Sequence, residues 1–294
     1  MPFDLANVRD LTGRVIKTEW VAAGSYGDIW KGTYTLIGGQ SVIVAMKIMR
    51  STALLDSQSA EKTKRRILRE TSVWSTCIHP HLAQFIGISY EVTREYPCLI
   101  SLFYENGDVM KYLKHNPNAM RMHLVCQFFS GLAYLHGRNI VHGDLKPPNI
   151  LIDNAGNAVL ADFGQSRILG VSGFTTSTMS VAGTRRYMAP ELMLPENPDA
   201  SPAPTKASDV WAAGMTGLEI LSDKIPYVEY QHDNKVVCAV EAEKLPNIEF
   251  YPNVPRGAWT AFESGCWKII PSKRSDVQRL SDWLYKQYGP DSSR

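Results

Sequence analysis

The chain has 294 residues, which is more than a single hydrophobic core usually absorbs, so two packed lobes are expected. Its 31 Lys and Arg residues nearly balance 29 Asp and Glu residues, and the formal net charge of +2 argues against nucleic acid as a partner. No apolar run reaches the roughly 18 residues that a membrane span needs.

The five cysteines are scattered and show no C-x-x-C spacing, which favours reduced thiols and argues against a metal site. The first residues lack the basic and apolar segments of a signal peptide. These features predict an intracellular, cytoplasmic protein. They leave the oligomeric state open.

The first third of the sequence has strand character. Residues 20–48 combine loose alternation with a β-branched apolar run and a turn at Gly38-Gly39, which predicts an antiparallel sheet. Residues 60–77 are charged and permit a helix that stops before His79-Pro80. Residues 85–90 and 97–103 predict two further strands.

The remainder of the chain is predominantly helical. Residues 122–136 place Leu124, Phe128, Leu132 and Leu135 on one buried stripe, and residues 208–221 and 259–270 also predict helices. Residues 195–204 are rich in proline and predict an exposed loop. The order predicts an α+β protein with a β-rich lobe of residues 1–104, a helical lobe of residues 105–294 and a cleft near residues 102–106.

A glycine pair interrupts the first predicted strands. Gly24 and Gly27 let backbone N–H groups approach phosphate oxygens without obstruction by a Cβ atom. Taken alone, this pair indicates no more than a hairpin turn. Its significance comes from the later strand that carries Lys47, and from the charged helix that carries Glu70.

The segment from His142 to Asn149 carries the strongest chemical signal. Asp144 and Asn149 flank Pro147 and Pro148, which forbid a regular helix, so this segment is a loop of defined geometry. A turn and a short apolar run then lead to Asp162, at the start of Asp-Phe-Gly. A carboxylate beside an incoming hydroxyl, with an Asn and a second Asp to hold Mg²⁺, is the set that phosphoryl transfer requires.

In this order and spacing, the motifs resemble those of a protein kinase from about residue 20 to residue 284. The resemblance implies that Asp144 accepts or orients the proton of the substrate hydroxyl, and that Lys146 steadies the transferring phosphoryl group. Asn149 and Asp162 would hold Mg²⁺, and Lys47 would hold the ATP phosphates while paired with Glu70.

The resemblance also implies an ATP site. Ala45 and Leu151 would cover the two faces of the adenine ring, residues 102–104 would supply backbone hydrogen bonds, and Ser101 would be a small gatekeeper at the back of the pocket. Ala22 stands where kinases usually have the first glycine of the phosphate loop. The full set assigned to ATP is Ala22, Gly24, Gly27, Ile29, Ala45, Lys47, Ser101, Leu102, Tyr104 and Leu151.

Gly143 replaces the arginine of the commoner His-Arg-Asp motif, and this change raises two alternatives. Small-molecule kinases of the aminoglycoside and choline type also resemble His-Gly-Asp, but they lack a segment such as residues 183–191, which ends in Ala189-Pro190-Glu191. A pseudokinase would use the same fold for binding alone, and only Ala22 and Gly143 support it. A protein substrate is therefore expected.

Three later features complete the resemblance. Asp209 resembles the helix residue that anchors the catalytic loop, and Arg274 resembles the residue that pairs with Glu191, although Ser275 replaces the usual following proline. Lys146 and Thr184 favour Ser/Thr specificity. The sequence around residues 188–191 and 208–221 is most similar to the tyrosine-kinase-like group of Ser/Thr kinases. Dual specificity stays open.

A cluster of hydroxyl residues precedes Thr184. Kinases often dock a phosphate carried by this stretch on the arginine that Gly143 replaces. The sequence therefore predicts that activation depends weakly on phosphorylation there, with any dependence carried by Arg66 and Arg167. The cluster comprises Thr175, Thr176, Ser177, Thr178 and Ser180.

Overall fold

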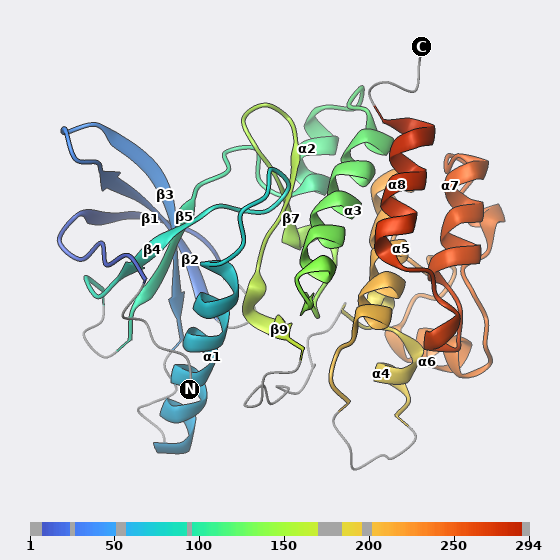
Figure 1. Cartoon of the computed structure of the whole chain (residues 1–294). Helices are drawn as coiled ribbons and strands as arrows, with labels where there is room; N and C mark the ends of the chain where they lie inside the picture. The colour runs from blue at the N-terminus through green and yellow to red at the C-terminus, as the bar shows by residue number, and fades with distance from the viewer. Residues whose placement is uncertain are drawn as a thin grey trace. The chain divides into compact units, whose positions relative to one another are not determined.

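The computed structural model describes residues 8–23, 27–50, 57–92, 96–169, 184–195 and 202–289, with side chains of the first helix described from residue 63. The chain forms two compact units, which Figure 1 draws with their elements labelled. The first comprises Met1–Ile78 and Leu82–Glu105, and the second comprises His79–His81 and Asn106–Arg294. Among the described helices, none combines the length and apolar character that crossing a bilayer requires.

The first unit is a five-stranded antiparallel sheet in the order β1-β2-β3-β5-β4, with one long helix beside it (Figure 1). This sheet, together with the helical second unit, confirms the predicted α+β fold. The helix predicted over residues 60–77 ends earlier, at Trp74. Tight turns follow it, in which Thr76 N donates to Val73 O and Cys77 N donates to Trp74 O. The elements are β1 Val15–Ala23, β2 Gly27–Thr35, β3 Ser41–Met49, α1 Ser57–Trp74, β4 Phe85–Ser89 and β5 Cys98–Leu102.

One face of this sheet forms a hydrophobic core. Alternate residues of β3, Val44 and Met46, are fully buried with Ile100 of β5 and Tyr34 of β2. Because side chains alternate between faces along a strand, the residues between these point to the other face. That second face carries Ala45 and Lys47.

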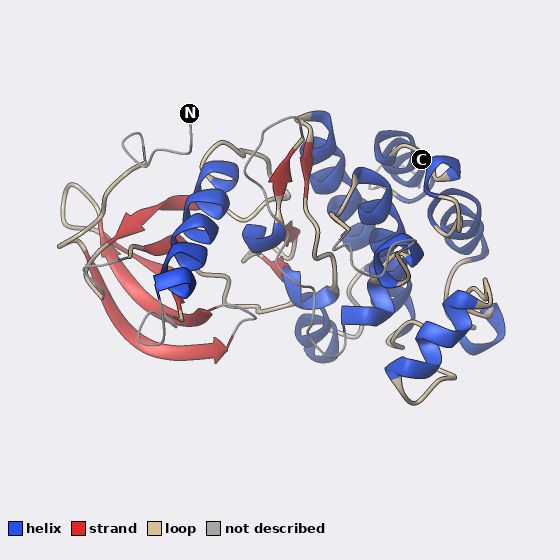
Figure 2. Cartoon of the chain, turned by 90° about the horizontal axis from the view of Figure 1, so that it is seen from below, coloured by secondary structure: helices blue, strands red, loops and turns tan. Residues whose placement is uncertain are grey.

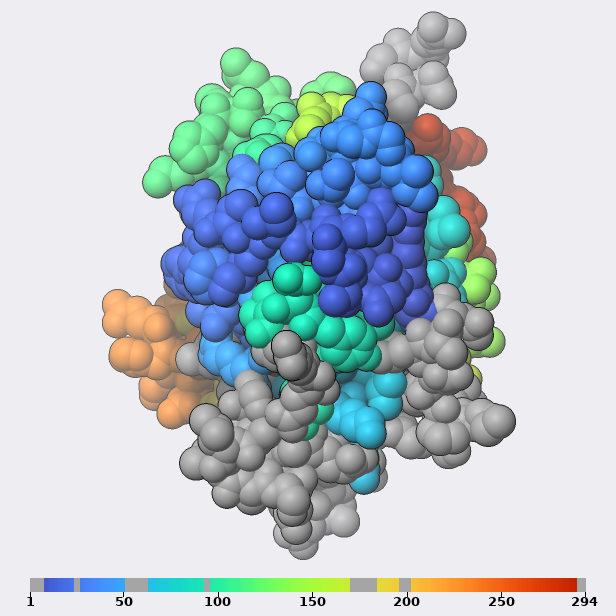
Figure 3. All heavy atoms as spheres, turned by 90° about the vertical axis from the view of Figure 1, so that its left-hand side faces the viewer, coloured from blue at the N-terminus to red at the C-terminus, as the bar shows by residue number. Residues whose placement is uncertain are grey.

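The residues before β1 close the β4 edge of the sheet. Leu11 N donates to Ile88 O at 2.8 Å, Ile88 N donates to Arg9 O at 2.9 Å, and Leu11 is fully buried. A Cβ atom at Gly87 would collide with the Arg9 carbonyl, so the glycine permits this approach. Figure 3 faces this side of the first unit, where the N-terminal residues (dark blue) lie beside the teal residues around the β4–β5 connection.

In the described part of the second unit, helices are the main regular elements, and four short strands accompany them (Figure 2). The stripe predicted in residues 122–136 is confirmed, since Leu124, Phe128, Leu132 and Leu135 are buried in α3. The helices are α2 Val109–His115, α3 Arg121–Gly137, α4 Pro190–Met193, α5 Lys206–Ser222, α6 Asp233–Glu241, α7 Arg256–Ala261 and α8 Val277–Tyr288, and the strands are β6 Ile140–Val141, β7 Ile150–Ile152, β8 Ala158–Leu160 and β9 Arg167–Ile168.

The bounds predicted for the helix over residues 259–270 are wrong at both ends. It begins earlier, at Arg256, and α7 passes into a π-helical turn, Phe262–Cys266, that ends the helical segment. Trp267 N donates to Phe262 O at 2.9 Å, which is the wider hydrogen bond of a π-turn. The turn directs Cys266 and Trp267 into the core, where both are buried.

Several elements were not predicted from the sequence. The first residues of β1 and the helices α2, α6 and α8 are present in the structure. In α8 a signal existed, because Val277, Leu280 and Leu284 have helical spacing and are buried. Residues 196–201, within the predicted proline-rich loop, lie outside the described residues.

Candidate active site

The strand register of the first unit brings predicted ATP residues onto one face of the sheet. Ile29 of β2 lies opposite Lys47 of β3, and Ala45 lies opposite Ser101 of β5. Ala22 of β1 lies opposite Ile29. Directly paired residues share a face, and Ala45 and Lys47 alternate with the core residues, so these five side chains belong to the face opposite the core.

An ion pair joins this face to α1. Lys47 Nζ lies 2.6 Å from Glu70 Oε1, and the two side chains are 9% and 0% exposed. The pairing that the kinase resemblance implied is confirmed. The carboxylate fixes the position of the ammonium group, because a charge-assisted hydrogen bond between two buried side chains is short and strong.

The phosphate-loop glycines are described in part. A Cβ atom at Gly27 would lie 2.5 Å from Ile48 O, so the close approach of β2 to β3 at this position requires a glycine. Gly24 lies outside the described residues. At the end of β5, Leu102 N donates to Gln84 O at 3.1 Å and the Tyr104 hydroxyl accepts from Gln84 N at 3.0 Å, so both predicted adenine-contact residues are anchored to the segment before β4.

In the second unit the loop after β6 gathers the predicted catalytic residues. Lys146 Nζ lies 2.8 Å from Asp144 Oδ2 and 3.4 Å from Thr184 Oγ1. The Asn149 amide donates to the carbonyl oxygen of Asp144 at 2.7 Å and to its Oδ2 at 3.2 Å. Pro147–Asn149 form one 3₁₀ turn, consistent with the constraint that the prolines impose.

The predicted metal ligands have suitable chemistry for Mg²⁺, which prefers oxygen ligands and is commonly held by one or two carboxylates together with substrate phosphates. Asn149 uses its NH₂ group toward Asp144, and this orientation leaves its amide oxygen as a ligand atom. Asp162 has left-handed backbone geometry with φ of 62°, which Asp tolerates, and its Oδ1 accepts from Gly164 N at 3.3 Å. These two residues therefore fit the ion.

The predicted adenine residue of this unit, Leu151, lies at the centre of β7. It pairs with Val159 of β8 and forms an isolated bridge with Asp108. Its side chain is half-buried, in contrast to the fully buried Ile150 and Ile152 on either side. Leu151 therefore presents an apolar surface from an otherwise buried strand.

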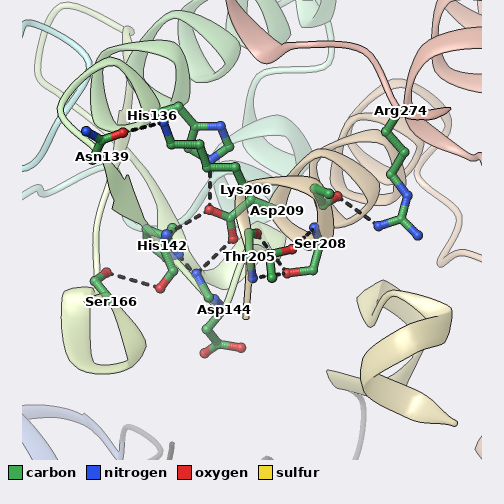
Figure 4. Close-up of polar contacts among 12 residues, drawn as sticks. His136, Asn139, His142, Asp144, Ser166, Thr205, Lys206, Ser208, Asp209 and Arg274 are labelled. Atoms are coloured by element: carbon green, nitrogen blue, oxygen red, sulfur yellow. Dashed lines mark hydrogen bonds and ion pairs between the residues drawn. The ribbon is translucent and has the colours of Figure 1, made fainter. Parts of the chain in front are cut away.

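A buried carboxylate anchors the catalytic loop (Figure 4). Asp209 of α5 accepts from His142 N at 2.8 Å and from Gly143 N at 2.9 Å, which confirms the anchoring role that the resemblance gave it. The start of α5 is itself stabilised by a capping box between Thr205 and Ser208. In Figure 4 the carboxylate of Asp144 points away from this cluster.

Gly143 has a structural requirement that the motif comparison could not reveal. Its φ is +84°, in the left-handed region that favours glycine. A Cβ atom there would lie 2.9 Å from Gln165 O and 3.3 Å from Pro204 Cγ. The backbone is therefore crowded at the position where the commoner His-Arg-Asp motif has arginine.

Buried polar contacts hold the segment after Thr184. Arg274 forms a two-point ion pair with Glu191, both contacts at 2.7 Å, so this predicted pair is confirmed. Tyr187 donates its hydroxyl to Glu219, and burial raises the pKa of both groups. Ser275, which replaces the usual proline, donates its N–H to Gly265 O at 2.8 Å, a bond that proline could not form.

A hollow lies beside Asp144 and Thr184 within the second unit. Apolar side chains line it together with several polar ones, which include Ser208 and Asp209. The lining residues are Gly143, Asp144, Leu145, Thr184, Tyr187, Met188, Ala189, Leu192, Ser208, Asp209 and Ala212.

A family model described as "Protein kinase domain" matches residues 17–285. The chain belongs to this family. It is 32% identical over 271 residues to serine/threonine-protein kinase STY46 of Arabidopsis thaliana, which covers 90% of this chain and 42% of the relative. It is 29% identical over 242 residues to mitogen-activated protein kinase kinase kinase 3 of the same plant, covering 81% and 36%.

A third relative is serine/threonine-protein kinase 12 of Arabidopsis thaliana, 31% identical over 264 residues, which cover 86% of this chain and 53% of the relative. These similarities confirm the resemblance to the tyrosine-kinase-like group of Ser/Thr kinases. The chain spans roughly a third to a half of the length of these three relatives.

Two side chains around the loop were not identified from the sequence. His136 of α3 lies 2.9 Å from Asp209, and Lys206 Nζ donates to Asn139 Oδ1 at 2.8 Å. The sequence did offer one signal for His136, because a histidine lies next to the buried stripe of α3 and a few residues before the loop. Its partner in α5 is distant in the sequence, and no local pattern predicts that contact.

Proposed function

We propose that the chain is an active protein kinase that transfers the γ-phosphoryl group of ATP to Ser or Thr hydroxyls of protein substrates. The observation that carries the proposal is the grouping of Asp144, Lys146, Asn149 and Thr184 in one loop region. A carboxylate for the acceptor hydroxyl and a lysine for the phosphoryl oxygens are thereby in mutual contact. Positioning and charge neutralisation provide most of the catalysis in this chemistry.

Each residue has a proposed step. Asp144 accepts a hydrogen bond from the acceptor hydroxyl and orients its oxygen, while Lys146 neutralises charge on the transferring group. Lys47, oriented by Glu70, binds the ATP phosphates. Asn149 and Asp162 would hold Mg²⁺, which would neutralise charge on the phosphate oxygens.

The proposed ATP contacts follow the sheet face already described. Ala22, Gly24, Gly27 and Ile29 cover the phosphates and sugar, residues 102–104 bond adenine through their backbone, and Ser101 lies behind the ring. Ala45 and Leu151 provide apolar contact to the two ring faces. We further propose a cytoplasmic location, which remains to be tested by imaging of the tagged protein.

Two observations favour a protein acceptor over a small alcohol. The segment that ends in Glu191 is held by Arg274, and the hollow beside Asp144 extends along Met188, Ala189 and Leu192 of that segment. Purified protein should therefore label Ser/Thr peptides more rapidly than Tyr peptides or small alcohols. Preferred labelling of small alcohols would contradict this part of the proposal.

The decisive experiment compares wild type with Asp144→Asn. If Asp144 orients the nucleophile, the variant should keep its nucleotide affinity and lose turnover by about 10²-fold or more. Asp276→Asn is the matched control, because Asp276 caps the distant helix α8 and Asn caps equally well. Equal turnover of wild type and Asp144→Asn, or nucleotide binding by an inactive wild type, would favour a pseudokinase.

A further inference from the structure

One buried arginine close to the proposed acceptor site has no part in the proposed chemistry. Arg186 lies two residues after Thr184, in the same 3₁₀ turn, and is 6% exposed. Its neighbours Tyr187 and Met188 are among the described residues that line the hollow beside Asp144, and Arg186 is not. A guanidinium stays charged in proteins, so its burial requires acceptors for its N–H groups.

The acceptors come from the connection between α5 and α6. Arg186 Nη1 donates to Pro226 O at 2.9 Å and to Tyr227 O at 3.0 Å, and Nη2 donates to Tyr230 O at 2.8 Å. The Nε group donates to Oδ1 of Asp233, the first residue of α6, at 3.0 Å. Most donors of the rigid guanidinium fork therefore bond one short stretch of chain.

That stretch is a turn of fixed and unusual geometry. Tyr227 has a left-handed backbone with φ of 57°, which is uncommon for a bulky residue, and it is 1% exposed. The carbonyl groups before and after its Cα atom both bond Nη1 of Arg186. From another side, the Tyr251 hydroxyl accepts from Val228 N at 3.1 Å and donates to Ile225 O at 3.0 Å. Strained backbone persists where several contacts hold it, so this turn is a rigid anchor for the arginine.

A second arginine holds the beginning of the same connection from a different element. Arg121, the first residue of α3, donates to Ile220 O at 2.6 Å and bonds both carboxylate oxygens of Asp223, at 2.9 Å and 2.6 Å. Arg121 thus joins the connection to α3, whereas Arg186 joins it to the segment beside Thr184. The two arginines use the same kind of bonds and differ in what they hold.

We propose that Arg186 is a positioning residue for the protein acceptor. By bonding the α5–α6 connection, it fixes the turn that carries Thr184 and the following residues, Met188 and Ala189, which line the hollow beside Asp144. Figure 1 shows α4, which continues this segment, beside α6. In this proposal Arg186 contacts neither the nucleotide nor the reacting hydroxyl. The expected effect on the acceptor rests on the proposed kinase function, whereas the expected effect on the segment does not.

Steady-state kinetics with the Ser/Thr peptide that wild type labels most rapidly separates this role from catalysis. Arg186→Met keeps an unbranched side chain and removes every donor. We expect its KM for the peptide to rise by about tenfold or more, with KM for ATP within twofold of wild type. A peptide KM within twofold of wild type would overturn the proposal, and so would an equal rise in KM for ATP.

Arg186→Lys separates the charge from the shape of the guanidinium. Lysine keeps the positive charge but lacks the planar fork that reaches several carbonyl groups at once. Its KM for the peptide should therefore stay at least about fivefold above that of wild type. If Arg186→Met does not fold, this variant carries the test, and a peptide KM within twofold of wild type would contradict the proposal.

The matched control is Arg121→Met, which removes the other arginine of the α5–α6 connection. It should lower the free energy of unfolding and leave KM for the peptide within twofold of wild type, because Arg121 does not hold the acceptor segment. If Arg121→Met raised KM for the peptide as much as Arg186→Met, a general loosening of the connection would explain both results. The proposal would then be wrong.

Amide hydrogen exchange follows the segment without requiring turnover. Met188 N donates to Arg185 O at 3.1 Å, and Leu192 N donates to Ala189 O at 3.0 Å. Exchange at these two amides should be faster in Arg186→Met than in wild type or Arg121→Met, with α8 exchange unchanged. Unchanged exchange at both amides in Arg186→Met would overturn the positioning role. If wild type shows no turnover, the kinase function fails, and this measurement still decides whether Arg186 fixes the segment.

Discussion

The two units hold their proposed catalytic residues in different ways. In the first, Lys47 and Glu70 meet through the tips of two long side chains, one from a strand and one from a helix. In the second, Asp144 belongs to a loop whose backbone amides bond a buried carboxylate of α5. The first arrangement therefore depends on side-chain charge, and the second depends on backbone position.

This difference predicts different responses to substitution. A side-chain ion pair can be lost without disturbing the strands and helix that carry it. A backbone anchor cannot be displaced without leaving buried N–H groups unsatisfied, and each such group costs about 1–3 kcal/mol. Changes in the first unit should thus reduce activity more than stability, and changes at the loop should reduce both.

After Asp144→Asn, the largest effect on activity is expected for Glu70→Gln. The substitution keeps the shape of the side chain and removes the charge that orients Lys47, so turnover should fall by about 10²-fold, or 2.7 kcal/mol. Steady-state kinetics with denaturant unfolding would measure both properties. Lys111→Gln is the control, because the Lys111 side chain is 75% exposed and a solvated lysine of this kind contributes about 0–1 kcal/mol through its ion pair with Asp108. If Glu70→Gln lowered the free energy of unfolding as much as it lowered activity, the two units would not differ in the way proposed.

The loop is tested by comparing Gly143→Ala with Gly107→Ala. Both glycines have positive φ, +84° and +68°, so both substitutions carry the cost of left-handed geometry, about 1–2 kcal/mol. Only Gly143 is crowded, since the nearest atom to an added Cβ at Gly107 is Lys111 Cδ at 3.7 Å. Gly143→Ala should be more destabilising by at least about 1 kcal/mol and should also lower turnover. Equal free energies of unfolding for the two variants would mean that Gln165 and Pro204 move to accommodate the added methyl group.

Much of the fold and many of the site contacts could be predicted from the sequence. Strand and helix patterns located the sheet, α1, α3 and α5, and motif resemblance gave the pairs Lys47–Glu70 and Glu191–Arg274. These features have local periodicity or a family pattern behind them. The roles of the ATP and metal residues remain predictions.

The features that escaped prediction depend on contacts between segments distant in the sequence. The left-handed geometry of Gly143 is coupled to Gln165 and Pro204. The donor from His136 reaches Asp209 across two helices. No window of sequence contains both partners of such a contact, so only the folded chain reveals why these residue types occur there.

The sheet face offers a smaller test of the first unit. Ser101 is small and lies in register with Ala45 and Phe85, so apolar space should extend behind the proposed adenine position. Inhibitors with a bulky aromatic group in that direction should bind wild type more tightly than Ser101→Met by at least about tenfold, or 1.4 kcal/mol. Calorimetry with a matched inhibitor lacking the aromatic group provides the control. Equal affinities for the bulky inhibitor would mean that another residue closes the pocket.

The smallest effect is expected from the hydroxyl residues before Thr184, Thr175, Thr176, Ser177, Thr178 and Ser180, which lie outside the described residues. Gly143 offers no side chain to a phosphate there, and a larger residue would meet Gln165 and Pro204. Arg66 and Arg167 are the basic residues expected to carry any remaining dependence. Replacing the five hydroxyl residues by Ala should therefore change turnover by less than about tenfold, or 1.4 kcal/mol.

Thr184→Ala is the matched control for this variant, because it removes one hydroxyl from the same segment at a position 3.4 Å from Lys146 Nζ. It should reduce turnover more than the five substitutions together, since it alters the group beside Asp144. Circular dichroism and unfolding would confirm that both variants are folded. A loss of about 10³-fold or more in the folded five-residue variant would contradict the prediction, because a loss of that size requires charge-assisted phosphate bonds that Gly143 cannot provide.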